Sequence, residues 1–234
     1  MVNFVLMLTE RDVTIPDALQ VYRDLVADEL RTIAVKDVGA DPEMIRELTR
    51  AAHEDGRSVL LELADMSEKG QERGYELALD LGVDQVVGAW SPRAAEALSG
   101  PGAPQYWPFA GQMSGSPLVL TGTPEQLSAD ARRLSAAPAV AGLVLMPYRQ
   151  STYPPRELLR QTVDASGVPV LVAGGVRGAE QIADIAAAGA WGFTMGGAAL
   201  ADRHDDPKSV SERVNEVLRL CREASGQLVI EEVK

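Results

Sequence analysis

Residues 168–203 read VPVLVAGGVRGAEQIADIAAAGAWGFTMGGAALADR, and the same arrangement occurs twice within them. A short apolar run, first at 169–173 and again at 191–195, is followed directly by two glycines. An amphipathic segment separates the two runs, which is the pattern of a parallel strand, a helix and a second parallel strand. The stretch therefore predicts two consecutive βα units of an α/β fold.

Two glycine pairs stand at the ends of these predicted strands, Gly174-Gly175 and Gly196-Gly197. In α/β barrels the seventh and eighth βα loops commonly bind phosphate. Glycines have no Cβ, so backbone N–H groups can approach an anion closely there. The following AALAD segment predicts a short helix whose positive end faces the same place. We expect the four glycines to bind phosphate; the alternative is that they only supply tight turns with positive φ.

The alternation of apolar runs and amphipathic segments continues through the whole chain. Eight such units without a linker predict one domain, residues 1–234, folded as a single (βα)8 TIM barrel of the α/β class. An open doubly wound sheet is the alternative, but its G-x-G-x-x-G signature after the first strand is missing. The predicted strands are 3–9, 32–38, 58–64, 85–90, 105–109, 141–146, 169–173 and 191–195.

Helix signals fill the gaps between these strands. A helix over 15–30 is expected from a Pro in its first turn, and one over 41–56 from an Asp cap and a closing Gly56. The segment 123–136 opens on a Thr cap followed by Pro and Glu. The Gly- and Pro-rich stretch 111–124 predicts a longer loop that forms a lid or rim.

Composition and charge limit the partners and the compartment. Hydrophobic residues make up 46% of the chain, and 34 acidic against 22 basic residues give a net charge of −12. No basic run is present, so we expect no nucleic-acid partner. The single cysteine, Cys221, allows no intrachain disulfide, and no stretch resembles a signal peptide or a membrane span. We expect a cytoplasmic protein without a membrane partner; a homodimer is possible by analogy with other barrels of this size.

The pattern PVLVAGG…GFTMGGAAL within 169–202 resembles the phosphate motif of the phosphate-binding, ribulose-phosphate-binding-like superfamily of TIM barrels. That superfamily includes isomerases of the histidine and tryptophan pathways, indole-glycerol-phosphate synthase and N-acetylmannosamine-6-phosphate epimerase. The resemblance implies that the two glycine pairs bind the phosphate of a small phosphorylated metabolite. The segment VKDVG at 35–39 also resembles the strand-terminal lysine segment of the last two enzymes, where lysine handles protons, although it falls here on the second predicted strand rather than the third.

Lys36 and Glu62 are the candidate catalytic pair. Lys36 is the only one of four lysines inside a predicted strand. If the large apolar residues of the second and third strands face the helices, alternation turns Lys36 and Glu62 into the barrel near its C-terminal end. Desolvating a charged pair is costly, so function is the favoured explanation and a structural ion pair the alternative.

Three functions remain open for such a pair. A lysine as acid and a carboxylate as base can move a proton next to a carbonyl, as an isomerase or epimerase does. A desolvated Lys36 could instead form a Schiff base in an aldolase or decarboxylase. A barrel without catalysis that binds a phosphorylated ligand is the third possibility.

Further side chains at the predicted strand ends complete the candidate site. Glu10, Asp37 and Asp65 are additional acidic candidates, with helix or loop capping as the alternative for the last two. Only two histidines are present, so we expect no zinc and no cofactor, although magnesium held by the acids stays open. The expected pocket residues are Trp90, Trp107, Phe109, Gln112, Tyr148 and Arg149, with packing at the rim as the alternative for the aromatic ones. Arg149 and Arg177 are the expected cations for a phosphate or a substrate carboxylate.

Overall fold

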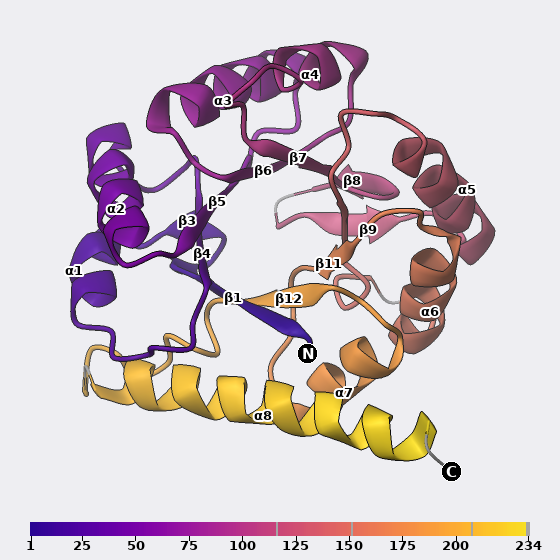
Figure 1. Cartoon of the computed structure of the whole chain (residues 1–234). Helices are drawn as coiled ribbons and strands as arrows, with labels where there is room; N and C mark the ends of the chain where they lie inside the picture. The colour runs from indigo at the N-terminus through magenta and orange to yellow at the C-terminus, as the bar shows by residue number, and fades with distance from the viewer. Residues whose placement is uncertain (116, 151, 207, 233–234) are drawn as a thin grey trace.

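Eight parallel strands form one sheet that curves around a central axis, and the helices lie outside it (Figure 1). The computed structural model describes residues 1–115, 117–150, 152–206 and 208–232. The strands follow one another in the order β10-β11-β12-β1-β4-β5-β6-β7. Their bounds are β1 (Asn3–Met7), β4 (Thr32–Lys36), β5 (Ser58–Glu62), β6 (Gln85–Gly88), β7 (Gln105–Pro108), β10 (Leu143–Leu145), β11 (Val170–Val172) and β12 (Gly192–Met195).

The sheet closes between its two outer strands, β7 and β10. Two parallel bridges, Tyr106 with Val140 and Phe109 with Val144, join them, and the N–H of Ala110 donates to the carbonyl of Val144 at 2.8 Å. The chain is therefore a (βα)8 TIM barrel, and the fold predicted from the sequence is confirmed.

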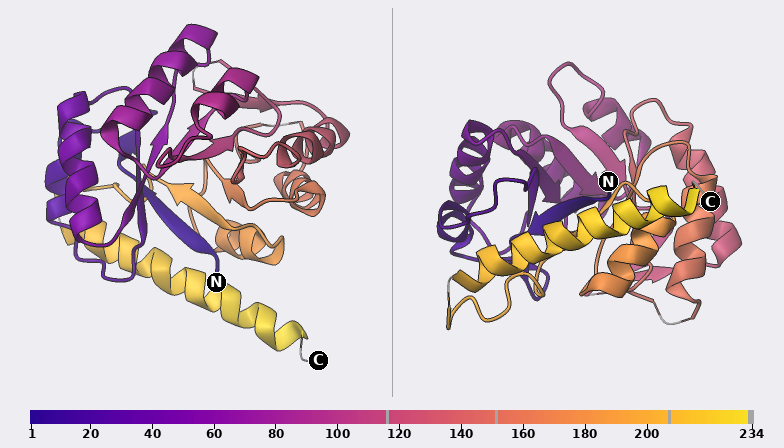
Figure 2. Two further views of the ribbon diagram at one scale, coloured as in Figure 1. Left: turned by 45° about the horizontal axis from the view of Figure 1, so that its top comes forward. Right: turned by 60° about the horizontal axis from the view of Figure 1, so that its bottom comes forward.

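A helix follows each barrel strand and covers its outer face. The last helix lies across the outside of the barrel beside α7 and β1, as the three views in Figures 1 and 2 agree. The helices are α1 (Ala18–Arg23), α2 (Pro42–Glu54), α3 (Glu68–Leu81), α4 (Pro92–Ala97), α5 (Pro124–Ser135), α6 (Pro155–Ala165), α7 (Ala179–Ala187) and α8 (Lys208–Glu232).

Local sequence signals set most helix starts. Asp41 caps α2 by accepting from the N–H of Glu43, and Thr123 with Gln126 forms a complete capping box at α5. The prediction for 15–30 is wrong in length, because α1 has only six residues. The backbone beyond it bonds elsewhere: the N–H of Val26 donates to Ser211 of α8, and the carbonyl of Val26 accepts from Asn215.

Two hairpins extend from the C-terminal ends of barrel strands. The first, β2 (Thr9–Glu10) and β3 (Val13–Thr14), follows β1. The second, β8 (Gln112–Ser114) and β9 (Val119–Thr121), follows β7 and falls within the stretch predicted as a lid or rim. The first hairpin was not predicted from the sequence.

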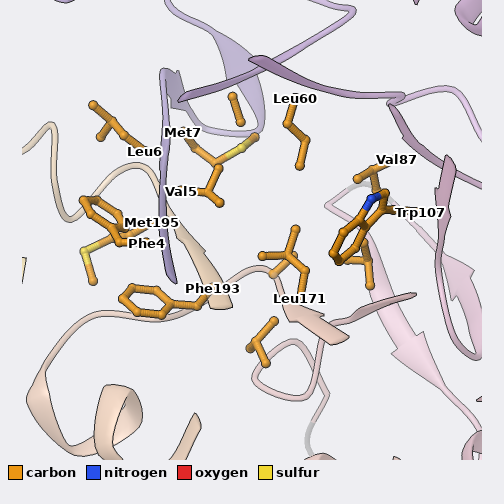
Figure 3. Close-up of a cluster of buried hydrophobic side chains, with 14 of the residues drawn as sticks. Phe4, Val5, Leu6, Met7, Leu60, Val87, Trp107, Leu171, Phe193 and Met195 are labelled. Atoms are coloured by element: carbon orange, nitrogen blue, oxygen red, sulfur yellow. The ribbon is translucent and has the colours of Figure 1, made fainter. Parts of the chain in front are cut away.

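Side chains of β1 alternate between the two faces of the sheet. Figure 3 shows Phe4 and Leu6 on one side of the strand, with the Phe4 ring stacked on Phe193 at 5.5 Å between centroids. Val5 and Met7 lie on the other side and face the barrel interior (Figure 3). The barrel interior beside β1 is thus filled by packed side chains. The interior side chains facing β1 in Figure 3 are Leu60, Val87, Trp107 and Leu171.

Candidate active site

A cavity of about 790 Å³ lies at the C-terminal end of the barrel. Residues from both glycine pairs line it, together with Lys36 and Glu62. The tip of the second hairpin, at 117–119, forms part of its wall. Active sites of TIM barrels occur at this end, so the cavity is the candidate site.

Lys36 and Glu62 meet inside this cavity. The strands β4 and β5 run in register, which places the two residues side by side. Their side chains form an ion pair with 3.1 Å between Nζ and Oε1, and each residue is only 4% exposed. The orientation predicted from alternation is therefore confirmed for both side chains.

Asp12 is the residue of the site that the sequence analysis missed. Its carboxylate lies 3.1 Å from Nζ of Lys36 and accepts two hydrogen bonds from the guanidinium of Arg149, at 2.8 and 2.7 Å. The site is therefore a chain of alternating charges that runs from Glu62 through Lys36 and Asp12 to Arg149. Fork-shaped pairing of this kind fixes orientation as well as charge.

The neighbouring charges shift the pKa values within this chain. Burial opposes the ammonium form of Lys36, but Glu62 and Asp12 together outweigh burial and raise the pKa of Lys36 above its ordinary value. The hydrogen bonds from Arg149 lower the pKa of Asp12 to about 2, with burial opposing and Lys36 assisting. Both groups are therefore charged at neutral pH.

The cavity carries more positive than negative charge in a chain whose net charge is −12. Asp12 and Glu62 are its only lining carboxylates among the described residues. In the described part of the chain, neither Arg11 nor Arg177 forms an ion pair. Such a concentration of cations in a concave site attracts anions. The cationic lining residues are Arg11, Lys36, Arg149 and Arg177.

The first glycine pair has conformational and packing reasons to be glycine. Gly174 and Gly175 have φ values of 72° and 83°. A Cβ on Gly174 would lie 2.6 Å from Nε of Arg149, and one on Gly175 would lie 3.0 Å from Cβ of Tyr148. Glycine at these two positions therefore leaves space for the side chains of Arg149 and Tyr148, and this reason does not depend on any ligand.

Gly197, in the second pair, has neither of the structural reasons to be glycine that apply to the first pair. A Cβ there would meet no atom within 4 Å, so neither packing nor a positive φ explains it. Within the described residues, no protein group accepts a hydrogen bond from the N–H of Gly174, Gly175 or Gly197. These N–H groups are donors at the wall of a positively charged cavity, as an anion site requires.

The helix expected at AALAD does not form. The N–H groups of Ala199 and Leu200 both donate to the carbonyl of Gly196, which gives a single turn. Asp202 then adopts a left-handed φ of 59°, which ends any helical path. The prediction of a helix dipole facing the site is therefore wrong.

Three predicted acids lie outside the cavity. Glu10 pairs with Arg203 at 3.0 Å. Asp65 accepts from the N–H of Ser67 and pairs with Arg73 on the surface. Asp37 accepts from the N–H of Ala64 at 2.7 Å, and burial raises its pKa. These carboxylates serve turns and ion pairs, so the expectation that they join Lys36 and Glu62 is corrected.

The expected pocket residues divide between two places. Tyr148, Arg149 and Arg177 line the main cavity. Trp107 is buried in the barrel and packs against Trp191, with 5.2 Å between centroids. A second cavity of about 560 Å³, on the other side of the hairpin β8–β9, is lined by Trp90, Phe109 and Gln112. The expectation that these three share the pocket of Lys36 is therefore corrected.

Comparisons with known proteins found similar solved structures but no related sequence. No protein-family model matches the sequence, and no curated protein matches it. The native KDPGal structure aligns over 94% of this chain and 95% of its own, with a TM-score of 0.69 and 14% identity. Tryptophan synthase from M. tuberculosis, in an open form, aligns over 96% and 93%, with a TM-score of 0.65 and 15% identity. Mandelate oxidase aligns over 94% and 73%, with a TM-score of 0.66 and 17% identity.

The likeness is one of fold. At these identities the solved structures support the (βα)8 barrel and say nothing about a shared reaction. Among the described helices, none is both long enough and apolar enough to cross a membrane. The function must therefore be argued from the side chains of the cavity.

Proposed function

We propose that this chain is an enzyme that moves a proton next to a carbonyl group of a small phosphorylated, sugar-like metabolite, as isomerases and epimerases do. The observation that carries the proposal is the buried pair of Lys36 and Glu62 on the wall of a cavity that both glycine pairs also line. An acid and a base are thus adjacent to each other and to a candidate anion site.

Glu62 is the base in this proposal. Two cations surround Asp12 and lower its pKa to about 2, so Asp12 is a weak proton acceptor. Glu62 pairs with Lys36 alone among the described residues. Its carboxylate removes the proton from the carbon beside the carbonyl, and the same carboxylate returns it at the end of the reaction.

Lys36 is the acid. As an ammonium group it donates a hydrogen bond to the carbonyl oxygen and stabilises the negative charge that develops there when the carbon loses its proton. It transfers a proton to that oxygen to form the enediol. The resulting amine then removes the proton of the hydroxyl on the neighbouring carbon, while Glu62 delivers its proton to the former carbonyl carbon, so that the carbonyl group moves by one carbon. The balance needs no oxidant, reductant or second substrate.

The phosphate is assigned to the mouth of the cavity beside the glycine pairs. The N–H groups of Gly174, Gly175 and Gly197 supply donors. Arg177, which forms no ion pair with any described residue, supplies a positive charge at the same wall. Phosphate binding at these loops is common in barrels. The resemblance of residues 169–202 to a phosphate motif supports the same assignment.

A Schiff-base lyase is the second candidate function. It is favoured by the fact that Lys36 is the only lysine of the cavity among the described residues. Against it, two carboxylates hold Lys36 as an ammonium, and an imine forms only from the neutral amine. We therefore favour the proton-transfer function over the lyase.

Deuterium exchange separates the two functions. Phosphorylated ketoses and aldoses of three to six carbons are incubated with the protein in D2O and followed by proton NMR. We expect deuterium to enter one substrate at the carbon beside its carbonyl without cleavage of a carbon–carbon bond. Cleavage of a carbon–carbon bond, together with trapping of the substrate on Lys36 by borohydride, would contradict this function and support the lyase.

Matched variants tie the exchange to the proposed residues. Lys36→Met and Glu62→Gln should each slow it by about 100-fold or more, the usual contribution of a general acid or base. Lys69→Met, on the surface of α3, and Asp65→Asn, just after β5, are the controls and should keep the wild-type rate. Full exchange in Glu62→Gln would refute Glu62 as the base.

A further inference from the structure

The first hairpin holds Lys36 at two points. Thr14 is fully buried, and its hydroxyl bonds to both the N–H and the carbonyl of Lys36 at 2.8 Å. Asp12, two residues earlier, binds the side chain of the same lysine at 3.1 Å. One short element therefore fixes both the backbone and the ammonium of Lys36.

The turn of this hairpin has an unusual backbone. The two residues between β2 and β3, Arg11 and Asp12, both have positive φ values, of 49° and 65°. Two-residue turns of this type favour Asn-Gly or Asp-Gly, because residues with a Cβ are strained there. Strained backbone that persists without glycine often belongs to a functional site. Here it directs the Asp12 carboxylate toward Lys36.

Arg149 binds Asp12 from the end of another barrel strand, β10, which β11 and β12 separate from β1. It follows β10, and its two terminal nitrogens bind the two oxygens of Asp12. Both side chains are about one-quarter exposed, at 26% and 27%, whereas those of Lys36 and Glu62 are 6% and 5% exposed. Asp12 and Arg149 thus lie above the buried pair, on the side nearer the solvent.

We propose that Asp12, held by Arg149, is a positioning residue that keeps Nζ of Lys36 beside Glu62 as an ammonium. Lys36 consequently acts as a proton donor and does not form imines. This inference rests on the proposed function in one respect, since it takes Lys36 as the acid. Its claim about the charge of Lys36 can be measured without any substrate.

The measurement is the titration of the lysine Nζ atoms by NMR after selective ¹⁵N labelling of lysine. The chain has only four lysines, so the signal of Lys36 is the one that disappears in Lys36→Met. Asp12→Asn removes the charge and retains the turn, because Asn tolerates a left-handed φ. We expect the titration midpoint of Lys36 to fall in Asp12→Asn, while the other three lysines are unchanged.

Glu10→Gln is the matched control. It removes a carboxylate from the same hairpin, but one that pairs with Arg203 outside the cavity. It should leave the midpoint of Lys36 where the wild type has it. Asp12→Gly, which relieves the strain of the turn and also removes the carboxylate, should lower the midpoint as Asp12→Asn does. An unchanged midpoint in both Asp12 variants would overturn the proposal.

Imine trapping gives a second readout that distinguishes this proposal from the proposed function. Glycolaldehyde phosphate and borohydride are added near pH 8, and the peptide containing Lys36 is quantified by mass spectrometry. We expect little labelling in the wild type and several-fold more in Asp12→Asn. Equal labelling in the two proteins together with an unchanged midpoint would overturn the role of Asp12. Heavy labelling of the wild type together with a lowered midpoint in Asp12→Asn would refute proton transfer as the function and leave the electrostatic role of Asp12 intact.

Discussion

The Nε atom of Arg149 occupies the space that a side chain on Gly174 would need, since a Cβ built there would lie 2.6 Å away. Arg149 therefore spans from the first glycine pair, beside its Nε, to Asp12, at its terminal nitrogens. The candidate anion site is therefore connected to the Lys36–Glu62 pair through two side chains, Arg149 and Asp12.

Gly174→Ala tests this relationship. The substitution forces a Cβ onto a residue with a φ of 72° and displaces Arg149. We expect a loss of more than about 1 kcal/mol of unfolding free energy, because alanine is strained at positive φ. Urea unfolding measures the loss. A stability equal to that of the wild type would show that the loop accepts a side chain there.

Gly197→Ala gives the opposite expectation. Its new methyl group meets no protein atom, so the melting temperature should stay unchanged while the group intrudes on a bound anion. Calorimetric titration with inorganic phosphate should show binding weakened about tenfold, which corresponds to about 1.4 kcal/mol. Gly100→Ala, also without contacts and located in the loop between α4 and β7, is the control. Unweakened binding in Gly197→Ala would place phosphate elsewhere.

The buried ion pair predicts a non-additive effect on stability. Lys36→Met leaves Glu62 buried without its ammonium partner and should cost about 3–5 kcal/mol of unfolding free energy. The double variant Lys36→Met/Glu62→Leu should recover most of this loss, because no unpaired charge stays buried at Glu62. Urea unfolding of the three proteins is the measurement. A double variant less stable than Lys36→Met alone would contradict the expectation.

The pH dependence of stability should reveal the charge of Asp12. Its pKa is lowered from 3.8 to about 2 by Arg149 and Lys36, so its ionised form stabilises the fold above about pH 4. That contribution disappears as the pH falls through 2. The difference in unfolding free energy between the wild type and Asp12→Asn should be constant above pH 4 and shrink toward pH 2. A difference that does not vary with pH would show that Asp12 is not stabilised as an anion.

The sequence predicted those features that depend on neighbouring strands and local caps. Lys36 and Glu62 could be brought together from alternation alone, because adjacent parallel strands carry them in register. The starts of α2 and α5 followed from Asp41 and Thr123 for a similar reason, since a capping side chain and the backbone N–H that donates to it lie within a few residues.

Asp12 could not be predicted by these means. Its partner Arg149 is 137 residues away and lies across the mouth of the barrel, so no local pattern connects them. The turn that carries it contains Arg11 and Asp12 instead of the usual glycine, which conceals the hairpin. Glu10 was mistaken for a site residue because the sequence does not show which way a carboxylate at a strand end points. In the structure it points to Arg203, outside the cavity.

The second hairpin explains why Trp90 and Phe109 were wrongly expected in the pocket of Lys36. Trp90 and Phe109 do lie where β6 and β7 end, as expected. The hairpin β8–β9 forms part of the wall of each cavity, with residues 117–119 lining the main one and Gln112 and Thr121 lining the second. It therefore divides the strand ends into two cavities, which a count of strand ends does not reveal.

A crystal structure with inorganic phosphate tests the central claim most directly, namely that the cavity beside Lys36 and Glu62 binds a phosphorylated molecule. We predict phosphate density within hydrogen-bonding distance of the N–H groups of Gly174, Gly175 and Gly197, with the Lys36–Glu62 pair in the same cavity. Phosphate bound only away from these loops, for example beside Arg133 in the second cavity, would contradict the account.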